Sequence, residues 1–253
     1  MAKLTTDKLA ITNLERSILP RKPLGHRIDS GILVLFLTLS AGAFALLWLA
    51  SEVLEGDTFA LDRAILRDLR TTQNPSVLIG PHWLTFSMID VTSLGSVTVL
   101  TLITVLAVAF LVAVRKHTTA IFVAIAVSTG AALGSALKSL FFRARPDVVP
   151  HLVYVSSASF PSGHAMNSAV VYLTLATLLA RSQQAVGVRI FLLATAIFLT
   201  ILVGISRVFL GVHWPSDVVA GWCVGAAWAA MCSLVGKTLQ SRRKIEGPSR
   251  SSA

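Results

Sequence analysis

The chain has 253 residues, of which 54% are hydrophobic and 13% are charged, and its formal net charge at pH 7 is +10. Soluble globular domains carry about 25% charged residues, so the composition excludes that class and favours an integral membrane protein. A positive charge of this size also suits nucleic-acid binding, but its distribution along the chain favours a membrane topology, and no nucleic-acid partner is expected.

Uncharged apolar segments recur along the chain, and each can supply a transmembrane helix of about 17–25 residues. They predict an all-α, polytopic membrane protein whose six transmembrane helices form one bundle. The expected spans are about 31–50, 97–114, 118–137, 163–180, 190–206 and 217–236. The segment 190–206 is the shortest, and it can cross a bilayer if its helix continues into the polar residues that follow.

The distribution of Lys and Arg predicts the orientation of these spans. Six of the 22 lie in 1–30, two at 115–116, two at 181–189 and five in 237–253, and these four segments share one side of the predicted topology. Cytoplasmic loops are rich in Lys and Arg, so we expect both termini inside. The whole chain, 1–253, is then a single membrane domain with a cytoplasmic N-terminal segment and a basic cytoplasmic tail.

The long outer loop 51–96 contains a pattern typical of a short helix that lies in the membrane interface. Apolar and charged residues alternate in DTFALDRAILRDLRT at 57–71. Such a helix either covers a site or serves as a plain connector. Trp83 and Phe86, further along the loop, are expected to anchor it at the interface.

The loop after the third span concentrates positive charge on the side of the membrane where Lys and Arg are disfavoured. In KSLFFRARP at 138–146, Lys138 and Arg145 are seven residues apart, and Pro146 prevents a helix from continuing. A helix C-terminus favours cations and explains Lys138 alone, but it does not explain Arg143 and Arg145 as well. The presence of three positive charges on the disfavoured side of the membrane therefore needs an explanation within this loop.

The next motif, FPSGHAMN at 160–167, begins the fourth span. Ser162 is a candidate N-cap, and the free N–H groups and positive dipole end of the helix suit a phosphate. Gly163 allows a ligand to approach the backbone closely, and His164 lies in the first turn. A lone histidine in such a position is more often incidental than functional.

The third motif, SRVFLGVHWPSD at 206–217, lies between the last two spans. A helix beginning near Pro215 would bring His213 and Asp217, four residues apart, within hydrogen-bonding distance. The carboxylate would fix the tautomer of the imidazole and support a positive charge on it, as a nucleophile or base requires. Arg207 adds a cation that can bind two phosphate oxygens.

Together the motifs predict three cations, a helix N-terminus and two histidines on the outer face. This set suits phosphoryl transfer, in which charge on the equatorial oxygens must be stabilised. Two histidines and a carboxylate could also hold a metal ion, but Lys138, Arg145 and Arg207 would repel a divalent cation. No metal is therefore expected.

At these residues the sequence closely resembles the type 2 phosphatidic acid phosphatase superfamily of membrane lipid phosphatases. The family pattern is Lys, six residues, Arg-Pro; then Pro-Ser-Gly-His; then Ser-Arg, five residues, His, three residues, Asp. Every specified position matches in order and spacing: Lys138, Arg145-Pro146, Pro161-Ser162-Gly163-His164, Ser206-Arg207, His213 and Asp217. The resemblance covers about 138–217 directly.

The resemblance implies a role for each of these residues. His213 would be the nucleophile that forms a phosphohistidine, Asp217 would orient it, and His164 would protonate the leaving lipid oxygen. The residues expected to bind the substrate phosphate are Lys138, Arg145, Ser162, Gly163 and Arg207. The resemblance implies no cofactor and no metal, and it leaves Arg143, inside the variable stretch of the first motif, a supporting role at most.

The predicted function is an integral membrane lipid phosphatase that hydrolyses a phosphomonoester or pyrophosphate at the outer face of a membrane, expected to be the bacterial cytoplasmic membrane. Candidate substrates are a polyprenyl pyrophosphate, phosphatidylglycerol phosphate, phosphatidic acid and a lipid A phosphate. A lipid phosphotransferase with the same residues is an alternative. An anion- or lipid-binding transporter is a second one, although spans 31–50, 97–114 and 118–137 contain no charged residue that could line a path.

Two GxxxG pairs, Gly130/Gly134 and Gly221/Gly225, lie within the third and sixth predicted spans. Small residues at this spacing let helix backbones approach closely. We expect both pairs to mediate packing inside the bundle, with homodimerisation as the minority alternative. Apart from this possible homodimer, the expected partners are a lipid phosphate substrate and membrane lipids.

Overall fold

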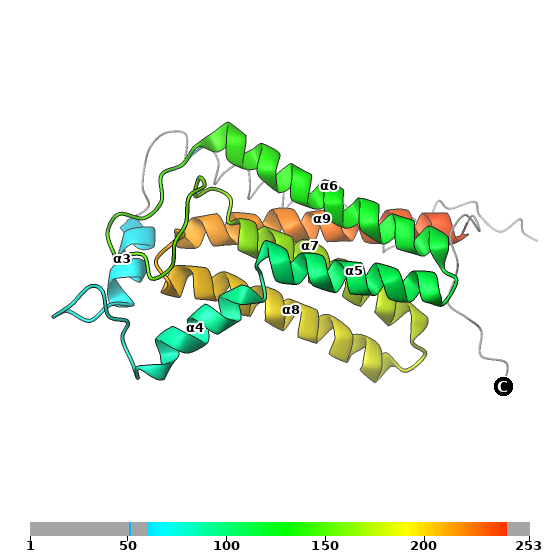
Figure 1. Cartoon of the computed structure of the whole chain (residues 1–253), viewed down its shortest axis with the longest axis horizontal. Coiled ribbons are helices and arrows are strands. Elements are labelled where there is room, and N and C mark those ends of the chain that lie inside the picture. Colours follow the sequence, from blue (N-terminus) through cyan, green and yellow to red (C-terminus); the bar gives the residue numbers. More distant parts are fainter. Residues whose placement is uncertain (1–50, 52–59, 242–253) are drawn as a thin grey trace, which may run out of the picture. The chain divides into compact units, whose positions relative to one another are not determined.

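The computed structural model describes Ser51 and residues 60–241, all of which belong to one compact unit, residues 35–253. Residues 60–241 contain seven α-helices (Figure 1). They are α3 (Ala60–Asp68), α4 (Trp83–Ser93), α5 (Val97–Ala113), α6 (His117–Phe141), α7 (Gly163–Ser182), α8 (Val186–Phe209) and α9 (Pro215–Ser241). The only β-type pairing in this range is an isolated bridge, so the predicted all-α class is confirmed for this part of the chain.

Within the described residues, four helices are long and apolar enough to cross a membrane by themselves: α6, α7, α8 and α9. The predicted span 97–114 corresponds to α5, which reaches the required length only together with α4, and these two helices are bent by 45° where they meet. Ser96 caps the second helix of the pair, since its Oγ accepts the N–H of Val99 at 3.2 Å. A bent pair thus takes the place of the single helix expected there.

The predicted span 31–50, the N-terminal segment 1–30 and the end of the basic tail lie outside the described residues. The described part holds four spans, or five if the bent pair counts as one. The total of six spans and the side on which each terminus lies therefore stay predictions.

The shortest predicted span, 190–206, is longer in the structure. It forms α8, a helix of 24 residues, because the helix continues into the polar residues that follow, as the sequence required. Ser206 and Arg207 in its last turns are 0% and 4% exposed. Polar groups are thus buried at the end of an apolar helix, where they need partners from the protein or from a ligand.

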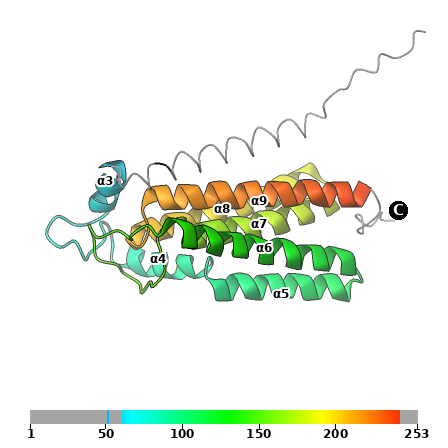
Figure 2. The same cartoon turned by 90° about the horizontal axis from the view of Figure 1, so that it is seen from above.

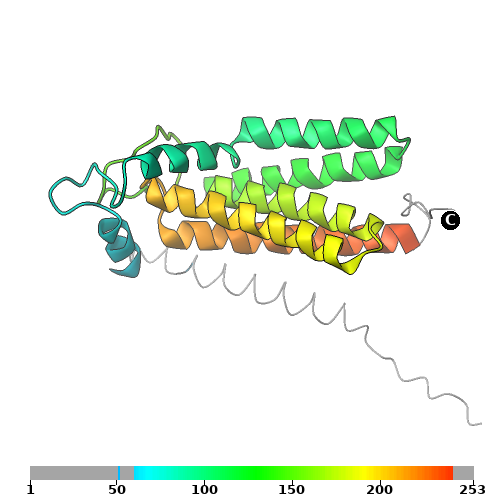
Figure 3. The ribbon, with the colours of Figure 1, turned by 90° about the horizontal axis from the view of Figure 1, so that it is seen from below.

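Helix α7 packs against α9, α8, α6 and α5 and so forms the core of the bundle (Figures 2 and 3). Glycines permit its closest approach to α9: a Cβ on Gly221 would lie 2.7 Å from the carbonyl oxygen of Ser162, and one on Gly225 would lie 2.5 Å from that of Met166. The glycine pair of α6 is crowded in the same way by side chains of α7 and α9. Packing within the bundle, the main expectation for both GxxxG pairs, is confirmed.

The polar motifs gather at one end of the bundle (Figure 1). Helix α6 ends and α7 begins there, joined by the loop 142–162, and α8 ends and α9 begins there, joined by the loop 210–214. The turns 114–116 and 183–185 lie at the opposite end, and in or beside them are Lys and Arg residues predicted to be cytoplasmic. The bundle therefore separates the two groups of charge as the sequence predicted.

The short amphipathic helix expected within 57–71 is present as α3. It contacts α9, with Asp62 and Leu66 buried and its other charged residues exposed. Helix α3 thus packs on the start of α9 rather than serving as a plain connector. Trp83 and Phe86, the expected interfacial anchors, are both 64% exposed.

Candidate active site

The loop 210–214 and the first turn of α9 carry the histidine and carboxylate that the sequence pairs. Gly211 turns the chain with a φ of +73°, a conformation that L side chains rarely adopt. Helix α9 begins at Pro215, as predicted, and His213 Nδ1 lies 3.4 Å from Asp217 Oδ2. Both side chains are buried, with exposed fractions of 1% and 0%.

Asp217 is held on both of its carboxylate oxygens. Besides facing His213, Oδ2 accepts the backbone N–H of Trp214 at 3.0 Å and the hydroxyl of Ser159, a residue that no sequence pattern singled out. Oδ1 accepts Arg143 Nη1 at 2.6 Å in a buried ion pair. The carboxylate cannot rotate without breaking several charge-assisted hydrogen bonds, so its orientation toward the imidazole is well defined.

Arg143, to which the sequence gave a supporting role at most, makes two buried ion pairs beside the site. It is 9% exposed, and besides Asp217 it pairs with Asp62 of α3, with 3.3 Å between Nη2 and Oδ2. Asp62, which lies within the amphipathic stretch 57–71, was not predicted to be part of the site either. The partners it finds in space are 81 and 154 residues away along the chain, a separation that leaves no local signal.

Arg145 lies against the ring of His213. Its Nη1 donates to the carbonyl oxygen of Val212 at 2.5 Å and lies 3.3 Å from His213 Nε2. Its Nε donates to the carbonyl oxygen of Ser157 at 2.8 Å, which anchors the guanidinium from the other side. A cation thus faces the imidazole nitrogen that points away from Asp217.

Lys138, at the end of α6, is brought to the N-terminus of α7. Its Nζ donates to the carbonyl oxygen of Ala158 at 2.7 Å. Its Cε lies 3.3 Å from the position that a Cβ on Gly163 would take, so a larger residue at 163 would crowd the lysine. The predicted phosphate-binding motifs therefore meet where α7 begins.

Arg207 and Ser162 are buried polar residues with unused hydrogen-bonding capacity. Arg207 Nη1 donates to Thr92 Oγ1 of α4 at 3.0 Å, but its Nε has no partner. Ser162 occupies the N-cap position of α7, yet its hydroxyl makes neither the predicted capping bond nor any other. Buried polar atoms without partners are rare, and both groups are donors suited to a ligand's oxygen atoms.

His164, in the first turn of α7, is half-buried against the bend between α4 and α5. A Cβ on Gly95 in this bend would lie 3.3 Å from the Cβ and from the Cδ2 of His164. The bent pair therefore contributes to the site twice, by packing on His164 and by supplying Thr92 to Arg207.

Burial lowers the pKa of His213 from 6.5 to about 4; the hydrogen bond to Asp217 opposes this effect, and the charges of Arg145 and Arg207 reinforce it. The ring is therefore neutral at pH 7. Because Nδ1 faces the carboxylate, we assign the proton to Nδ1 and the lone pair to Nε2. An unprotonated nitrogen beside a cation suits attack on a group whose oxygens carry negative charge.

No three His, Cys, Asp or Glu side chains within residues 60–241 lie close enough together to hold a metal ion. The cluster instead brings together Lys138, Arg145 and Arg207 around two histidines. Arginine and lysine side chains in this arrangement fit the oxygens of a phosphate group.

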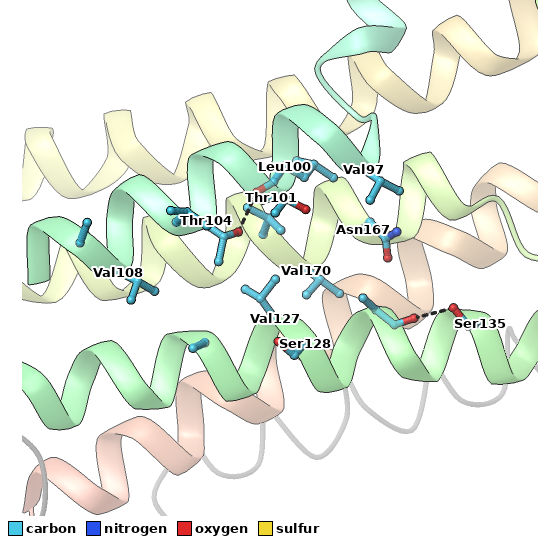
Figure 4. Close-up of a pocket in the computed structure, with 15 residues that line it drawn as sticks. Val97, Leu100, Thr101, Thr104, Val108, Val127, Ser128, Ser135, Asn167 and Val170 are labelled. Carbon is cyan, nitrogen blue, oxygen red and sulfur yellow. Dashed lines mark hydrogen bonds between the residues drawn. The ribbon is translucent and has the colours of Figure 1, made fainter. Parts of the chain in front are cut away.

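An apolar cavity of about 610 Å³ lies between α5, α6 and α7 (Figure 4). Valine and alanine side chains such as Val127 make up much of its wall. Ser135 of α6 and Asn167 of α7 lie toward the same end of it, one turn before Lys138 on α6 and one turn after His164 on α7. The cavity therefore begins beside the polar cluster and continues along the apolar part of the bundle.

The PAP2 superfamily matches residues 117–241, a range that includes all three motifs. Phosphatidylglycerophosphatase B of Bacillus subtilis (strain 168) is 37% identical over 153 residues, which are 59% of this chain and 74% of that protein. An undecaprenyl-diphosphatase of Sulfolobus acidocaldarius is 38% identical over 88 residues, which are 35% of this chain and 38% of that protein.

The fold is similar to the crystal structure of the first transmembrane PAP2 type phosphatidylglycerolphosphate phosphatase from Bacillus subtilis. The TM-score is 0.71 with 30% sequence identity, and the match covers 80% of this chain and 97% of that one. The similarity thus extends well beyond the three motifs to the arrangement of the helices. On the combined evidence of motif, sequence and fold, the chain belongs to the PAP2 superfamily and is a hydrolase of phosphate esters.

Proposed function

We propose that the chain removes phosphate from a membrane lipid through a phosphohistidine formed on His213. The observation that carries this proposal is the buried pair of His213 and Asp217, whose outward ring nitrogen lies 3.3 Å from Arg145 Nη1. A neutral, oriented histidine beside a cation meets the requirements for a nucleophile toward phosphorus.

The reaction has two steps. In the first, His213 Nε2 attacks the phosphorus atom and the N–P bond forms as the P–O bond to the lipid breaks. His164, which takes up a proton as the negatively charged phosphate binds beside it, donates that proton to the leaving oxygen. Asp217 stabilises the positive charge that the His213 ring then carries. In the second, His164 takes a proton from water, whose oxygen attacks the phosphorus, and the N–P bond breaks to release inorganic phosphate.

The oxygens of the transferred group are bound by Lys138, Arg145 and Arg207, assisted by the Ser162 hydroxyl and the backbone of Gly163. The unpartnered Arg207 Nε and Ser162 Oγ support this assignment, because both are buried donors without an acceptor in the protein. Stabilising the charge on these oxygens is the main part of phosphoryl-transfer catalysis. Three cations supply that charge, so we propose that no metal ion takes part.

A lipid substrate is supported by the cavity between α5, α6 and α7, which would receive an apolar chain while the phosphate lies in the cluster. The similar proteins include a phosphatidylglycerophosphatase and an undecaprenyl-diphosphatase. We therefore propose a glycerophospholipid phosphate or a polyprenyl pyrophosphate as the first substrates to test, with phosphatidic acid and a lipid A phosphate completing the panel. The site would face the outer side of the membrane, away from the Lys- and Arg-rich turns.

The test is phosphate release from this panel by the purified, detergent-solubilised protein in excess chelator. We expect wild type to release phosphate and His213→Ala to be slower by about a thousand-fold or more, since loss of a catalytic nucleophile has effects of at least this order. The matched control is His117→Ala, which removes an exposed histidine at the opposite end of the bundle and should leave the rate unchanged.

Each other outcome would overturn a specific part of the proposal. Release that stops with chelator would contradict the metal-free mechanism, and full activity in His213→Ala would contradict the nucleophile assignment. If no lipid yields phosphate, a radiolabelled lipid phosphate is offered together with alcohol acceptors. A labelled acceptor would then indicate a phosphotransferase, and binding without turnover would indicate a transporter or binding protein.

A further inference from the structure

A second layer of charge lies behind the pair of His213 and Asp217. Arg143 Nη1 is 2.6 Å from Asp217 Oδ1, and its Nη2 is 3.3 Å from Asp62 Oδ2. The guanidinium also lies over the ring of Trp214, 5.6 Å from its centroid. Through one planar group, Arg143 joins α3 to the acid that faces the nucleophile.

Asp62 is bound to the start of α9 as well as to Arg143. Its Oδ1 accepts the backbone N–H of Ser216 at 3.0 Å, and its Oδ2 accepts the hydroxyl of the same serine. The first N–H groups of a helix have no partner within the helix, and the positive end of its dipole favours an anion. Asp62 of α3 therefore caps the N-terminus of α9 at Ser216, the residue directly before Asp217.

Arg70, which follows α3, makes a separate contact with the loop that carries His213. It is 5% exposed, and its Nη1 donates to the carbonyl oxygen of Phe209 at 2.9 Å. A Cβ on Gly211 would lie 2.7 Å from Arg70 Nη2. The α3 region thus contacts the chain on both sides of His213, at Phe209 and at Ser216.

Asp217 depends on these contacts because it is completely buried. A buried carboxylate is costly unless it is paired and hydrogen-bonded, and removing one partner of a buried ion pair leaves the other uncompensated. With Arg143 on Oδ1, only Oδ2 remains for His213, Ser159 and Trp214. Without Arg143, the carboxylate would turn toward its remaining donors and loosen its hold on the imidazole.

We propose that Asp62 and Arg143 are positioning residues, which hold Asp217 in register with His213, so that the nucleophile is fully oriented only while α3 is docked on α9. This inference rests on the proposed function, since it assumes that His213 reacts. Neither side chain is assigned a contact with the substrate; both act through Asp217 and the first turn of α9.

Removing either residue should lower kcat more than it raises KM. We expect Arg143→Gln to reduce kcat about 100-fold and Asp62→Asn about 10-fold, because a small misplacement of a reacting group has effects of this order. KM should change by less than about three-fold, since the phosphate-binding cations are untouched. Asn at position 62 still offers an oxygen to the N–H of Ser216, so its effect reports the lost charge.

The pH dependence of kcat/KM separates positioning from simple destabilisation. The charged groups that act on His213 are Asp217 from α9, Arg145 from the loop 142–162 and Arg207 from α8. His164 from α7 interacts with His213 and is itself acted on by Lys138 from α6. Without the positive charge of Arg143, the negative charge of Asp217 is less neutralised. It then stabilises the protonated form of His213 more strongly. The acid limb of Arg143→Gln should therefore move to higher pH, by on the order of one pH unit.

The experiment compares wild type with Asp62→Asn, Arg143→Gln, Arg143→Lys and the double variant Asp62→Asn/Arg143→Gln. Arg143→Lys keeps the charge and should restore the acid limb, although one ammonium cannot bind both carboxylates as the guanidinium does. The double variant should be no slower than Arg143→Gln, because the charge that Asp62→Asn removes acts through Arg143. The matched control is Asp68→Asn, which neutralises an exposed acid on the same helix and should behave as wild type.

The folded fraction and the midpoint of thermal inactivation are measured for each variant, so that a folding defect is seen separately from a catalytic one. If kcat per folded molecule and the acid limb stay at their wild-type values, the positioning role is wrong. His213→Ala is assayed in parallel. If it is active, the proposed function fails; if it is inactive while Asp62→Asn and Arg143→Gln are normal, only the present inference fails.

Discussion

At the scale of single residues, burial decides the charge of the proposed nucleophile. His213 lies 3.4 Å from a carboxylate that would by itself raise its pKa, yet the ring is 1% exposed and its pKa is lowered to about 4. Desolvation therefore outweighs the attraction of Asp217, aided by the positive charges of Arg145 and Arg207. A histidine that is neutral at pH 7 has the free lone pair that attack on phosphorus needs.

A pH profile tests this balance. The acid limb of kcat/KM in wild type should lie near pH 4: as the pH falls through this value, His213 takes up a proton and loses its lone pair, whereas above it the ring is neutral. A histidine with an ordinary pKa would instead give a limb near 6.5. The measurement is kcat/KM as a function of pH between about 3.5 and 8.

The substrate can contribute a limb of its own, because a phosphate monoester also titrates near pH 6. The profile is therefore repeated with a second substrate whose phosphate has a different pKa. A limb that moves with the substrate belongs to the substrate. A limb at pH 6.5 or above that stays in place in both profiles would contradict a buried, neutral His213.

At the scale of elements, the site depends on close packing between α7 and α9. The backbone N–H of Ser162, at the start of α7, donates to the carbonyl oxygen of Asp217 in α9 at 3.0 Å. Gly221 and Gly225 follow Asp217 on α9 by one and two turns, and they let the backbones of α7 and α9 approach closely. The start of α7, where phosphate binding is proposed, and the carboxylate of α9 are thus held in one close contact.

Enlarging one of these glycines should weaken that contact. Gly225→Ala places a Cβ 2.5 Å from the carbonyl oxygen of Met166 and 2.6 Å from the Cβ of Ala169, and neither neighbour can rotate away. Overpacking of this kind destabilises by about 1–3 kcal/mol. The midpoint of thermal inactivation in one detergent should fall relative to wild type. Gly187→Ala is the control, because a Cβ there would meet nothing within 4 Å, and an equal midpoint for the two variants would contradict the packing argument.

At the scale of the whole described region, the proposed catalytic groups and the turns predicted to be cytoplasmic lie at two different ends. The loops with the proposed catalytic groups lie at one end of the bundle, and the turns beside Lys116, Arg181 and Arg189 lie at the other (Figure 1). The greater share of Lys and Arg in the chain is expected on the cytoplasmic side. This division predicts that substrate is dephosphorylated on the outer face.

Cysteine labelling in intact cells tests this orientation. In a background without Cys223 and Cys232, Asn74→Cys places a thiol in an exposed loop at the end with the proposed site, and Gln184→Cys places one in an exposed turn at the other end. A membrane-impermeant maleimide should label the first in intact cells and the second only after permeabilisation. The reverse pattern would place the site on the cytoplasmic side.

Much of the fold and part of the site follow from local sequence. Apolar length predicted the helices that became α6, α7, α8 and α9, and the spacing of His213 and Asp217 around Pro215 predicted their approach. Both signals act over a few helical turns, so the sequence alone carries them. Helix α4 and its bend to α5 were not predicted, because Asp90 interrupts the apolar run and the residues before it were assigned to the outer loop 51–96.

The sequence by itself determined the helical membrane class, the three motifs and the spacing that pairs His213 with Asp217. Only the tertiary structure decided what surrounds that pair: Arg143 and Ser159 on Asp217, Thr92 on Arg207, and Asp62 on the start of α9. These contacts join residues 58 to 154 positions apart. Helix periodicity relates residues within a few turns, whereas contacts at such separations depend on how whole helices pack, and burial, which sets the charge of His213, depends on the same packing.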